Sequence, residues 1–168
     1  MNTSPKALIL TGVAGCGKST LGRYASEHLA FKFLEGDDLH SVANTQKIRA
    51  GVPLDDEDRW PWLQSIVEWI DQNHNIGNSC VVTCSALKKI YREFIKYNRP
   101  FVQIVFIEIS KEAALDRVFY RRDHIFKPSL VDSQFFDLEI PSKEEGVIFL
   151  SAKEPVRDQY LKIKCAIQ

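Results

Sequence analysis

The sequence predicts an α/β fold in which a parallel sheet of five strands is covered by helices on both faces. Two observations lead to this prediction. Short apolar runs alternate with longer segments of helical spacing, and these runs are mostly apolar on both faces instead of alternating strictly with polar residues. Strands with two apolar faces are typical of parallel sheets, because the crossover helices cover both sides.

The predicted elements follow one another without a linker or an internal repeat. The expected strands are Lys6–Thr11, Lys32–Leu34, Cys80–Cys84, Phe101–Ile107 and Val147–Leu150. Helical spacing covers residues 18–30, 56–73, 87–97, 111–122 and 154–166. The stretch 123–146 is polar and carries Pro128 and Pro141, so we expect it to be less regular and a lid to lie at approximately residues 121–138. We therefore expect a single domain spanning residues 1–168.

Composition excludes several classes of protein. The 22 basic and 22 acidic side chains of the 168 residues cancel, which argues against a nucleic-acid partner. No apolar run approaches the ~20 residues of a membrane span, and we expect a cytoplasmic protein. The four cysteines match no zinc spacing. Cys80 and Cys84 lie two strand periods apart, which predicts two buried thiols on one side of the sheet.

The stretch GVAGCGKST at residues 12–20 carries the clearest chemical signal. Its first eight residues satisfy the phosphate-loop pattern G-x-x-x-x-G-K-[ST], and they lie between a predicted strand and a predicted helix. Backbone N–H groups of such a loop surround phosphate oxygens at the positive end of the helix. Lys18 would reach the β- and γ-phosphates, and Ser19 would offer a hydroxyl to Mg²⁺. The loop therefore predicts a bound nucleoside triphosphate and leaves the phosphate acceptor open.

Carboxylates follow the second predicted strand, in the stretch LEGDDLH at residues 34–40. Ligands of open α/β sheets bind outside the carboxyl ends of the strands, so Asp37 is placed to face the γ-phosphate. There it would orient and deprotonate an attacking hydroxyl, or hold Mg²⁺ through water. Glu35 and Asp38 fit this role and simple helix capping equally well.

Basic side chains mark three further stretches. Arg59 follows an acidic cluster at residues 55–58 that fits a helix start capped by Asp55, and its guanidinium would suit an anionic acceptor. Residues 85–92, SALKKIYR, suit a polar anionic substrate or a helix start whose basic groups face water. Arg117 and Arg121 share one helix face, where they would neutralise a transferring phosphoryl group or form a solvated basic face.

Taken together, these motifs resemble the gluconokinases, small kinases of the P-loop nucleoside-monophosphate and shikimate kinase type. The resemblance runs from about Leu8 to Pro141 and includes GVAGCGKST, GDDLH, PLDDEDRWPWLQ, CSALKKIYRE and SQFFDLEIP. It implies a P-loop kinase fold and the ATP-dependent phosphorylation of D-gluconate to 6-phospho-D-gluconate, which feeds the pentose phosphate pathway. It also implies Mg²⁺ as cofactor and ATP and gluconate as small-molecule partners, and it is compatible with a homodimer.

The resemblance also assigns residues. It implies ATP binding by Gly12, Val13, Ala14, Gly15, Cys16, Gly17, Lys18, Ser19, Thr20, Arg117 and Arg121, with Ser19 on the metal. It implies gluconate binding by Asp37, His40, Arg59, Lys88, Arg92, His124 and Gln134. The catalytic residues would be Lys18, Asp37 and Arg121, with Asp37 as the base.

The chain departs from the family pattern at a few positions. Ser41 follows His40 where the family usually has proline, Glu35 stands where aspartate is common, and the lid reads His124-Ile125-Phe126 in place of His-Phe. Two other functions remain open at this point. One is a related small kinase acting on shikimate, a nucleotide or another polyol, and the other is a non-catalytic nucleotide-binding switch.

Overall fold

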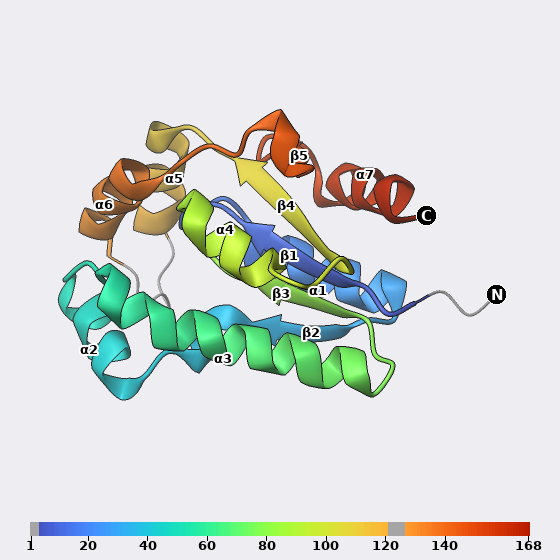
Figure 1. Ribbon diagram of the computed structural model, residues 1–168. Helices are drawn as coiled ribbons and strands as arrows, with labels where there is room; N and C mark the ends of the chain where they lie inside the picture. The colour runs from blue at the N-terminus through green and yellow to red at the C-terminus, as the bar shows by residue number, and fades with distance from the viewer. Residues whose placement is uncertain (1–3, 121–126) are drawn as a thin grey trace.

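The computed structural model describes residues 4–120 and 127–168, and a five-stranded parallel sheet lies at its centre (Figure 1). The strands are β1 (Ala7–Thr11), β2 (Lys32–Glu35), β3 (Cys80–Thr83), β4 (Val102–Glu108) and β5 (Ile148–Ser151), in the spatial order β2-β3-β1-β4-β5. Ala7 of β1 pairs with Cys80 on one side and with Val102 on the other. β1 is therefore the central strand, and its last residue, Thr11, directly precedes the phosphate loop. The predicted five-stranded α/β fold is confirmed.

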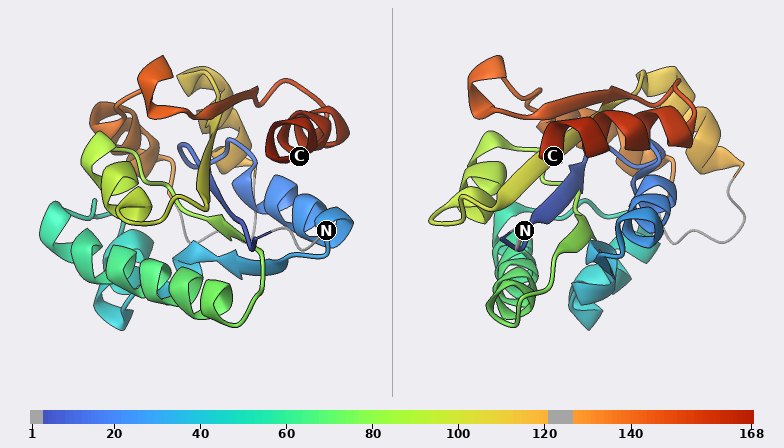
Figure 2. Two further views of the ribbon diagram at one scale, coloured as in Figure 1. Left: turned by 45° about the vertical axis from the view of Figure 1, so that its right-hand side comes forward. Right: turned by 90° about the vertical axis from the view of Figure 1, so that its right-hand side faces the viewer.

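Helices cover both faces of the sheet, as the two further views make clear (Figure 2). One face carries α1 (Lys18–Leu29) and α7 (Val156–Ile167), and the other carries α3 (Asp56–Asn75) and α4 (Lys89–Lys96). The remaining elements are α2 (Val42–Ala50), α5 (Lys111–Phe119), α6 (Ser129–Asp137) and the short 3-10 turns η1 (Gly36–Leu39) and η2 (Lys143–Glu145). Among the helices of the described residues, none has the length and apolar character that crossing a bilayer requires.

The core divides at the sheet because successive side chains of β1 point to opposite faces. Ile9 packs in the cluster that holds Leu63 and Ile66 of α3, whereas Leu8 and Leu10 belong to the cluster with α1 and α7. All five of these side chains are fully buried. This burial explains why β1 is apolar on both faces up to its last residue, Thr11, as expected for a sheet with helices on both sides.

The thiols of the described residues are free, and two of them lie where the sequence predicts. Cys80 and Cys84 are buried in the same core cluster, between the sheet and α3. Burial raises the pKa of both thiols to about 12. They are therefore inert packing residues at neutral pH.

The structure corrects the expectation for residues 123–146, whose described part is more regular than the prolines suggest. Helix α6 lies inside this stretch and buries Leu130 and Val131. Pro128 occupies its N-cap position and Pro141 lies beyond its end, so the prolines flank the helix without interrupting it. Strand β5 also differs from the prediction of two buried faces, because it is an edge strand and exposes Phe149.

Candidate active site

The phosphate loop is built on glycines that adopt conformations closed to other residues. Gly12, Gly15 and Gly17 have φ angles of 136°, 82° and 104°. A Cβ on Gly12 would lie 2.8 Å from the carbonyl oxygen of Ile107 in β4, so the loop packs against the sheet too closely for a side chain. Gly17 is the N-cap of α1 and no side chain caps this helix. The first amides of α1 are therefore available to phosphate oxygens.

Lys18, the first residue of α1, folds back over the loop. Its Nζ donates hydrogen bonds to the carbonyl oxygens of Gly12 and Val13, at 2.9 and 3.1 Å. The ammonium thus lies above the loop, where a triphosphate would lie, and it is held there by neutral acceptors. Exchanging these carbonyls for phosphate oxygens would give shorter and stronger hydrogen bonds, because the new acceptors are charged.

The acceptor side begins where β2 ends. The N–H of Gly36 donates to Thr83 Oγ1 of β3 at 3.1 Å, and the Thr83 hydroxyl donates to Glu35. Trp62 of α3 donates from Nε1 to the carbonyl oxygen of Gly36 at 2.7 Å. Three elements therefore fix the turn that carries Asp37. The side chain of Asp37 itself is 54% exposed and remains accessible to a ligand.

His40 is held between an aromatic ring and a carboxylate. Its ring stacks on Trp62, with centroids 4.3 Å apart and 17° between the planes, and its Nε2 lies 3.9 Å from Asp37 Oδ1. Burial lowers the pKa of His40 below its usual value, although the carboxylates of Asp37 and Asp58 act in the opposite direction. The ring is therefore neutral at pH 7, so one of its nitrogens donates a hydrogen bond and the other accepts one.

Arg59 lies in the first turns of α3. Asp55 caps this helix and forms a reciprocal capping box with Asp58, as predicted for the acidic cluster. Arg59 Nη1 contacts Asp137 Oδ2 of α6 at 2.8 Å and donates to the Tyr91 hydroxyl at 3.3 Å. Burial acts to lower the pKa of Arg59, but these two hydrogen bonds outweigh it and the net shift is upward.

A cleft brings the two sides together. It is lined by Ala14, Gly15, Gly17, Lys18, Ser19, Glu35, Asp37, His40, Ile48, Val52, Pro53, Leu54, Arg59, Trp62, Ser85, Val118, Leu130, Ser133 and Gln134. The phosphate loop, the acidic turn after β2 and the predicted acceptor arginine thus face one space. Gln134 of α6 also contacts the loop, because its Oε1 accepts a hydrogen bond from the Ala14 N–H at 2.6 Å.

A second cleft opens on the other side of the phosphate loop. It is lined by Gly15, Cys16, Gly17, Thr20, Leu21, Asp116, Arg117, Tyr120, Ala152, Glu154, Val156 and Gln159. Arg117 spans it, with Nη1 donating to the Gly15 carbonyl at 3.2 Å and Nη2 to the Ala152 carbonyl at 2.8 Å. This cleft begins at the phosphate loop, so it suits the nucleoside part of a triphosphate.

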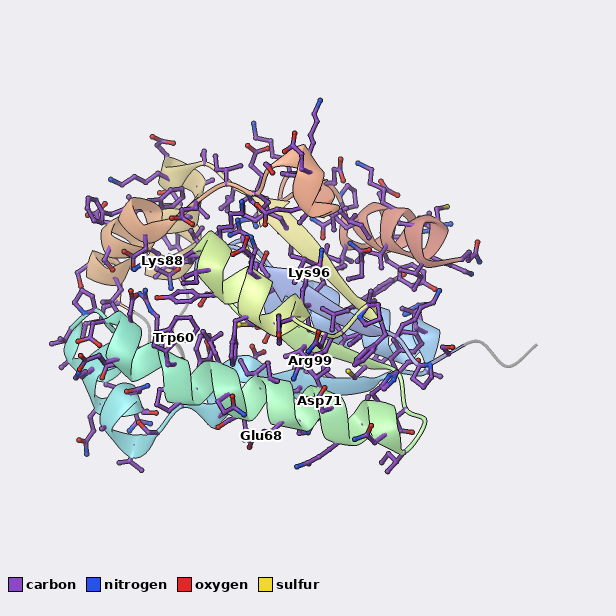
Figure 3. All side chains as sticks on the ribbon, viewed as in Figure 1. Trp60, Glu68, Asp71, Lys88, Lys96 and Arg99 are labelled. Carbon is purple, nitrogen blue, oxygen red and sulfur yellow. The ribbon has the colours of Figure 1, made fainter. Side chains whose placement is uncertain are left out.

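Two predicted acceptor residues lie outside the lining of the first cleft. The Nζ of Lys88, just before α4, contacts Asp56 Oδ1 at 2.6 Å, and Figure 3 shows Lys88 on the side where α3 and α4 begin. The side chain of Arg92 is 2% exposed and forms two hydrogen bonds with Glu145, at 2.8 and 3.0 Å. It also donates to the carbonyls of Ala86 and Leu87. Arg92 therefore joins α4 to η2 inside the protein.

The remaining predictions fall on other parts of the chain. Arg121 and His124, together with the first third of the expected lid (residues 121–126), lie outside the described residues. Val13 is buried in the cluster that joins the loop to α5 and α6. No cluster of three or more His, Cys, Asp or Glu side chains suited to a metal ion occurs in residues 4–120 and 127–168.

Two residues of the site are not among those the sequence singles out. Trp62 fits core packing on sequence grounds, and it does pack there, but it also lines the cleft and supports both His40 and Gly36. Asp137 pairs with Arg59 although 78 positions separate them. The available signal was the spacing of Gln134 and Asp137, which places both on one face once α6 is known to be a helix.

The comparisons with known proteins agree with this geometry. Residues 8–140 match the family model described as "AAA domain". The gluconokinase of Gluconobacter oxydans is 38% identical over 154 residues, which cover 92% of this chain and 86% of the relative. A sugar kinase from a Janibacter species superposes with a TM-score of 0.91 at 32% identity, covering 97% of this chain and 94% of its own. A gluconokinase from Sinorhizobium meliloti gives 0.86 at 32% identity, with 98% and 92% coverage. With its phosphate loop, acidic turn and α3 arginine around one cleft, the chain belongs to the gluconokinase family of P-loop kinases.

Proposed function

We propose that this protein transfers the γ-phosphoryl group of ATP to the 6-hydroxyl of D-gluconate, giving 6-phospho-D-gluconate. The observation that carries the proposal is the shared cleft, in which Lys18 and Ser19 of the phosphate loop face Asp37, His40 and Arg59. The proposed site of the phosphoryl donor and the proposed site of a hydroxylated anion therefore line the same cleft. The relatives named gluconokinase supply the identity of that anion.

On the donor side, the triphosphate occupies the loop and the nucleoside extends into the second cleft. Lys18 exchanges its two carbonyl partners for β- and γ-phosphate oxygens, and the first amides of α1 bind the same anion. Arg117, which already bridges the loop and the segment after β5, covers the nucleoside. Cys16 and Thr20 line this cleft and complete the proposed ATP contacts.

The residues at the loop fit a magnesium ion carried in with the triphosphate. The Ser19 hydroxyl lines the cleft together with the carboxylates of Glu35 and Asp37, and Mg²⁺ prefers such oxygen ligands while keeping several waters. Ser19 would bind the ion directly and Glu35 would orient its water. Once bound, the ion neutralises negative charge on the phosphate oxygens.

On the acceptor side, Asp37 orients the hydroxyl of gluconate and accepts its proton as the oxygen attacks phosphorus. The structure exposes this carboxylate while anchoring its backbone to β3 and α3. A fixed backbone with a free carboxylate is what a general base requires. Arg59 binds the carboxylate of gluconate, and neutral His40 hydrogen-bonds a hydroxyl of the sugar chain. Gln134 holds α6 on the loop.

Lys88 and Arg92 are left out of this proposed acceptor site, because neither lines the cleft and each is paired with a carboxylate away from it. Arg121 and His124 stay predictions from the family resemblance, with Arg121 neutralising the transferring group. We also propose a cytoplasmic location, which the free thiols support. The homodimer likewise stays a prediction, and light scattering of the purified protein measures it.

A coupled assay of ADP release tests the proposed function. With Mg·ATP present, gluconate is expected to stimulate ADP release, whereas shikimate, nucleoside monophosphates and glucose are not. Lys18→Ala and Asp37→Ala are each expected to lower kcat by about 10²-fold or more. Asp37→Ala keeps ATP affinity, because the carboxylate lies on the acceptor side. Asp38→Ala is the matched control, since this neighbouring carboxylate is exposed and does not line the cleft.

The outcomes separate the alternatives. ADP release with shikimate or a nucleotide, and none with gluconate, would make the protein a related kinase of different specificity. Tight ATP binding without transfer to any acceptor would make it a nucleotide-binding switch. Equal losses of ATP affinity in the two variants would remove Asp37 from the role of base.

A further inference from the structure

Helix α6 contacts both sides of the cleft within one turn. Gln134 accepts a hydrogen bond from the Ala14 amide of the phosphate loop, and Asp137, three residues later, pairs with Arg59 of α3. The helix is anchored beneath these contacts by its buried residues Leu130 and Val131. Its end is also fixed, because the Glu139 N–H donates to the Leu87 carbonyl at 3.0 Å. Asp137 therefore contacts Arg59 from a rigid position.

The hydrogen bonds of Arg59 leave one edge of its guanidinium for a ligand. A guanidinium has five N–H groups, two of which belong to Nη1. Both protein partners, Asp137 Oδ2 and the Tyr91 hydroxyl, contact Nη1. Within residues 4–120 and 127–168, neither Nε nor Nη2 makes a hydrogen bond to protein. The Nε–Nη2 edge presents two parallel donors, the arrangement that binds a carboxylate through both oxygens.

Burial makes the pair between Arg59 and Asp137 well suited to fixing an orientation. The side chains are 11% and 20% exposed, so salt screens their attraction much less than it screens an open surface pair. The Tyr91 hydroxyl that supports the same nitrogen is itself tied to Asp56, because it donates to that carboxylate. Arg59 also lines the cleft. Two fixed acceptors on one nitrogen thus determine how the rest of the guanidinium lies.

We propose that Asp137 is a positioning residue that holds Arg59 by Nη1 so that the Nε–Nη2 edge binds the carboxylate of the acceptor. This inference rests on the proposed phosphorylation of gluconate and goes beyond it, because it explains how the cleft selects an acid over a neutral polyol. Asp137 does not contact the substrate. Its effect passes through Arg59, so the loss of Asp137 should change acceptor recognition and leave ATP recognition intact.

The test is a steady-state comparison of Asp137→Ala, Asp137→Asn and the wild type with two acceptors. Gluconate carries the carboxylate, and D-glucitol is the same chain with a neutral hydroxymethyl group in its place. Asp137→Ala is expected to raise KM for gluconate about tenfold and to leave KM for ATP within about twofold. Its preference for gluconate over glucitol, measured as the ratio of kcat/KM values, falls by the same factor. Asp137→Asn keeps an oxygen acceptor for Nη1 and should recover most of the loss.

Two controls keep the result specific. Asp71→Ala removes an aspartate from another arginine pair, that with Arg99, whose atoms lie 2.6 Å apart toward the far end of α3 (Figure 3). Its kinetics should match the wild type. In an Arg59→Met background, Asp137→Ala should have no further effect on KM for gluconate, since a residue acting through Arg59 has nothing left to position.

The possible results decide between this proposal and the function on which it rests. A wild type that phosphorylates gluconate, with Asp137→Ala and Asp137→Asn both unchanged, overturns only the positioning role. A lower KM for gluconate in both variants would show that Asp137 competes with the acceptor, which also overturns it. If Asp137→Ala does not fold, Asp137→Leu, which also removes the acceptor for Nη1, takes its place, and a folded Asp137→Leu variant with unchanged acceptor preference is the overturning result. A wild type inactive with gluconate overturns the proposed function and this inference together.

Discussion

Replacing Arg92 with methionine tests whether this residue binds substrate or supports the fold. The family resemblance places it in the acceptor site, whereas the structure buries it against Glu145. Methionine keeps much of the side-chain length and removes the charge, leaving the Glu145 carboxylate, itself 12% exposed, without its partner. Breaking a buried ion pair from one side costs about 3–5 kcal/mol. We therefore expect Arg92→Met to lower the free energy of unfolding by about this amount.

Urea unfolding followed by fluorescence measures the change. With a slope of about 1–3 kcal/mol per molar urea, a loss of this size moves the midpoint by more than about 1 M. The hydrogen bonds from Arg92 lower the pKa of Glu145, so this pair stabilises the protein above the unfolded pKa and the stabilisation is lost as pH falls through the folded one. The difference in the free energy of unfolding between the wild type and Arg92→Met should therefore shrink at acid pH.

Kinetics of the folded fraction decide the role of Arg92. At a temperature where Arg92→Met is still folded, KM for gluconate should stay within about twofold of the wild type, because the guanidinium does not line the cleft. The double variant Arg92→Met/Glu145→Leu removes both charges and should regain part of the stability. An unchanged unfolding midpoint together with a large rise in KM for gluconate would refute this reasoning and return Arg92 to the acceptor site.

Two further predictions concern the turn that carries Asp37. Gly36→Ala is expected to cost about 1–3 kcal/mol, because a Cβ there would overlap the Thr83 carbonyl, and to lower kcat/KM for gluconate about a hundredfold by displacing Asp37. Its kinetic control is Gly77→Ala, which is strained by a φ of 82° but whose Cβ meets no atom within 4 Å, so activity should be retained; equal kinetics in the two variants would contradict the argument. The second prediction follows from the lowered pKa of His40, whose burial makes the unfolded chain bind a proton more readily than the folded one. Stability should therefore fall as pH drops through about 6.5, more steeply in the wild type than in His40→Asn, and parallel pH curves would exclude the effect.

Local patterns predicted much of the fold. The phosphate loop, the five strands and the cap at Asp55 each depend on residues within a few positions of one another, so the sequence displays them directly. Burial of the runs that form β1 and β3 was also predictable, because every residue in them except the last, a threonine, is apolar. The helix α6 was harder, since its prolines interrupt the pattern in sequence but lie at its borders in space.

Side-chain roles were harder to predict wherever a distant partner decides them. Arg59 and Arg92 look alike in sequence, as basic residues near predicted helix starts. Arg59 reaches the cleft, whereas Arg92 turns inward because Glu145, 53 positions away, meets it there. No periodicity connects such pairs, and only the folded chain shows which arginine keeps donors for a ligand.

The central place of β1 has a consequence for how acceptor specificity can change. The proposed nucleotide cleft is lined by α5 and the segment after β5, on the β4 side of the sheet. Most of the acceptor groups follow β2 and β3, on the opposite side, whereas the loop after β1 and helix α5 line both clefts. Substitutions in the segments after β2 and β3 therefore leave the hydrogen bonds of Arg117 in the other cleft in place. A protein engineer can diversify the segments after β2 and β3 to accept other sugar acids while keeping the proposed ATP contacts.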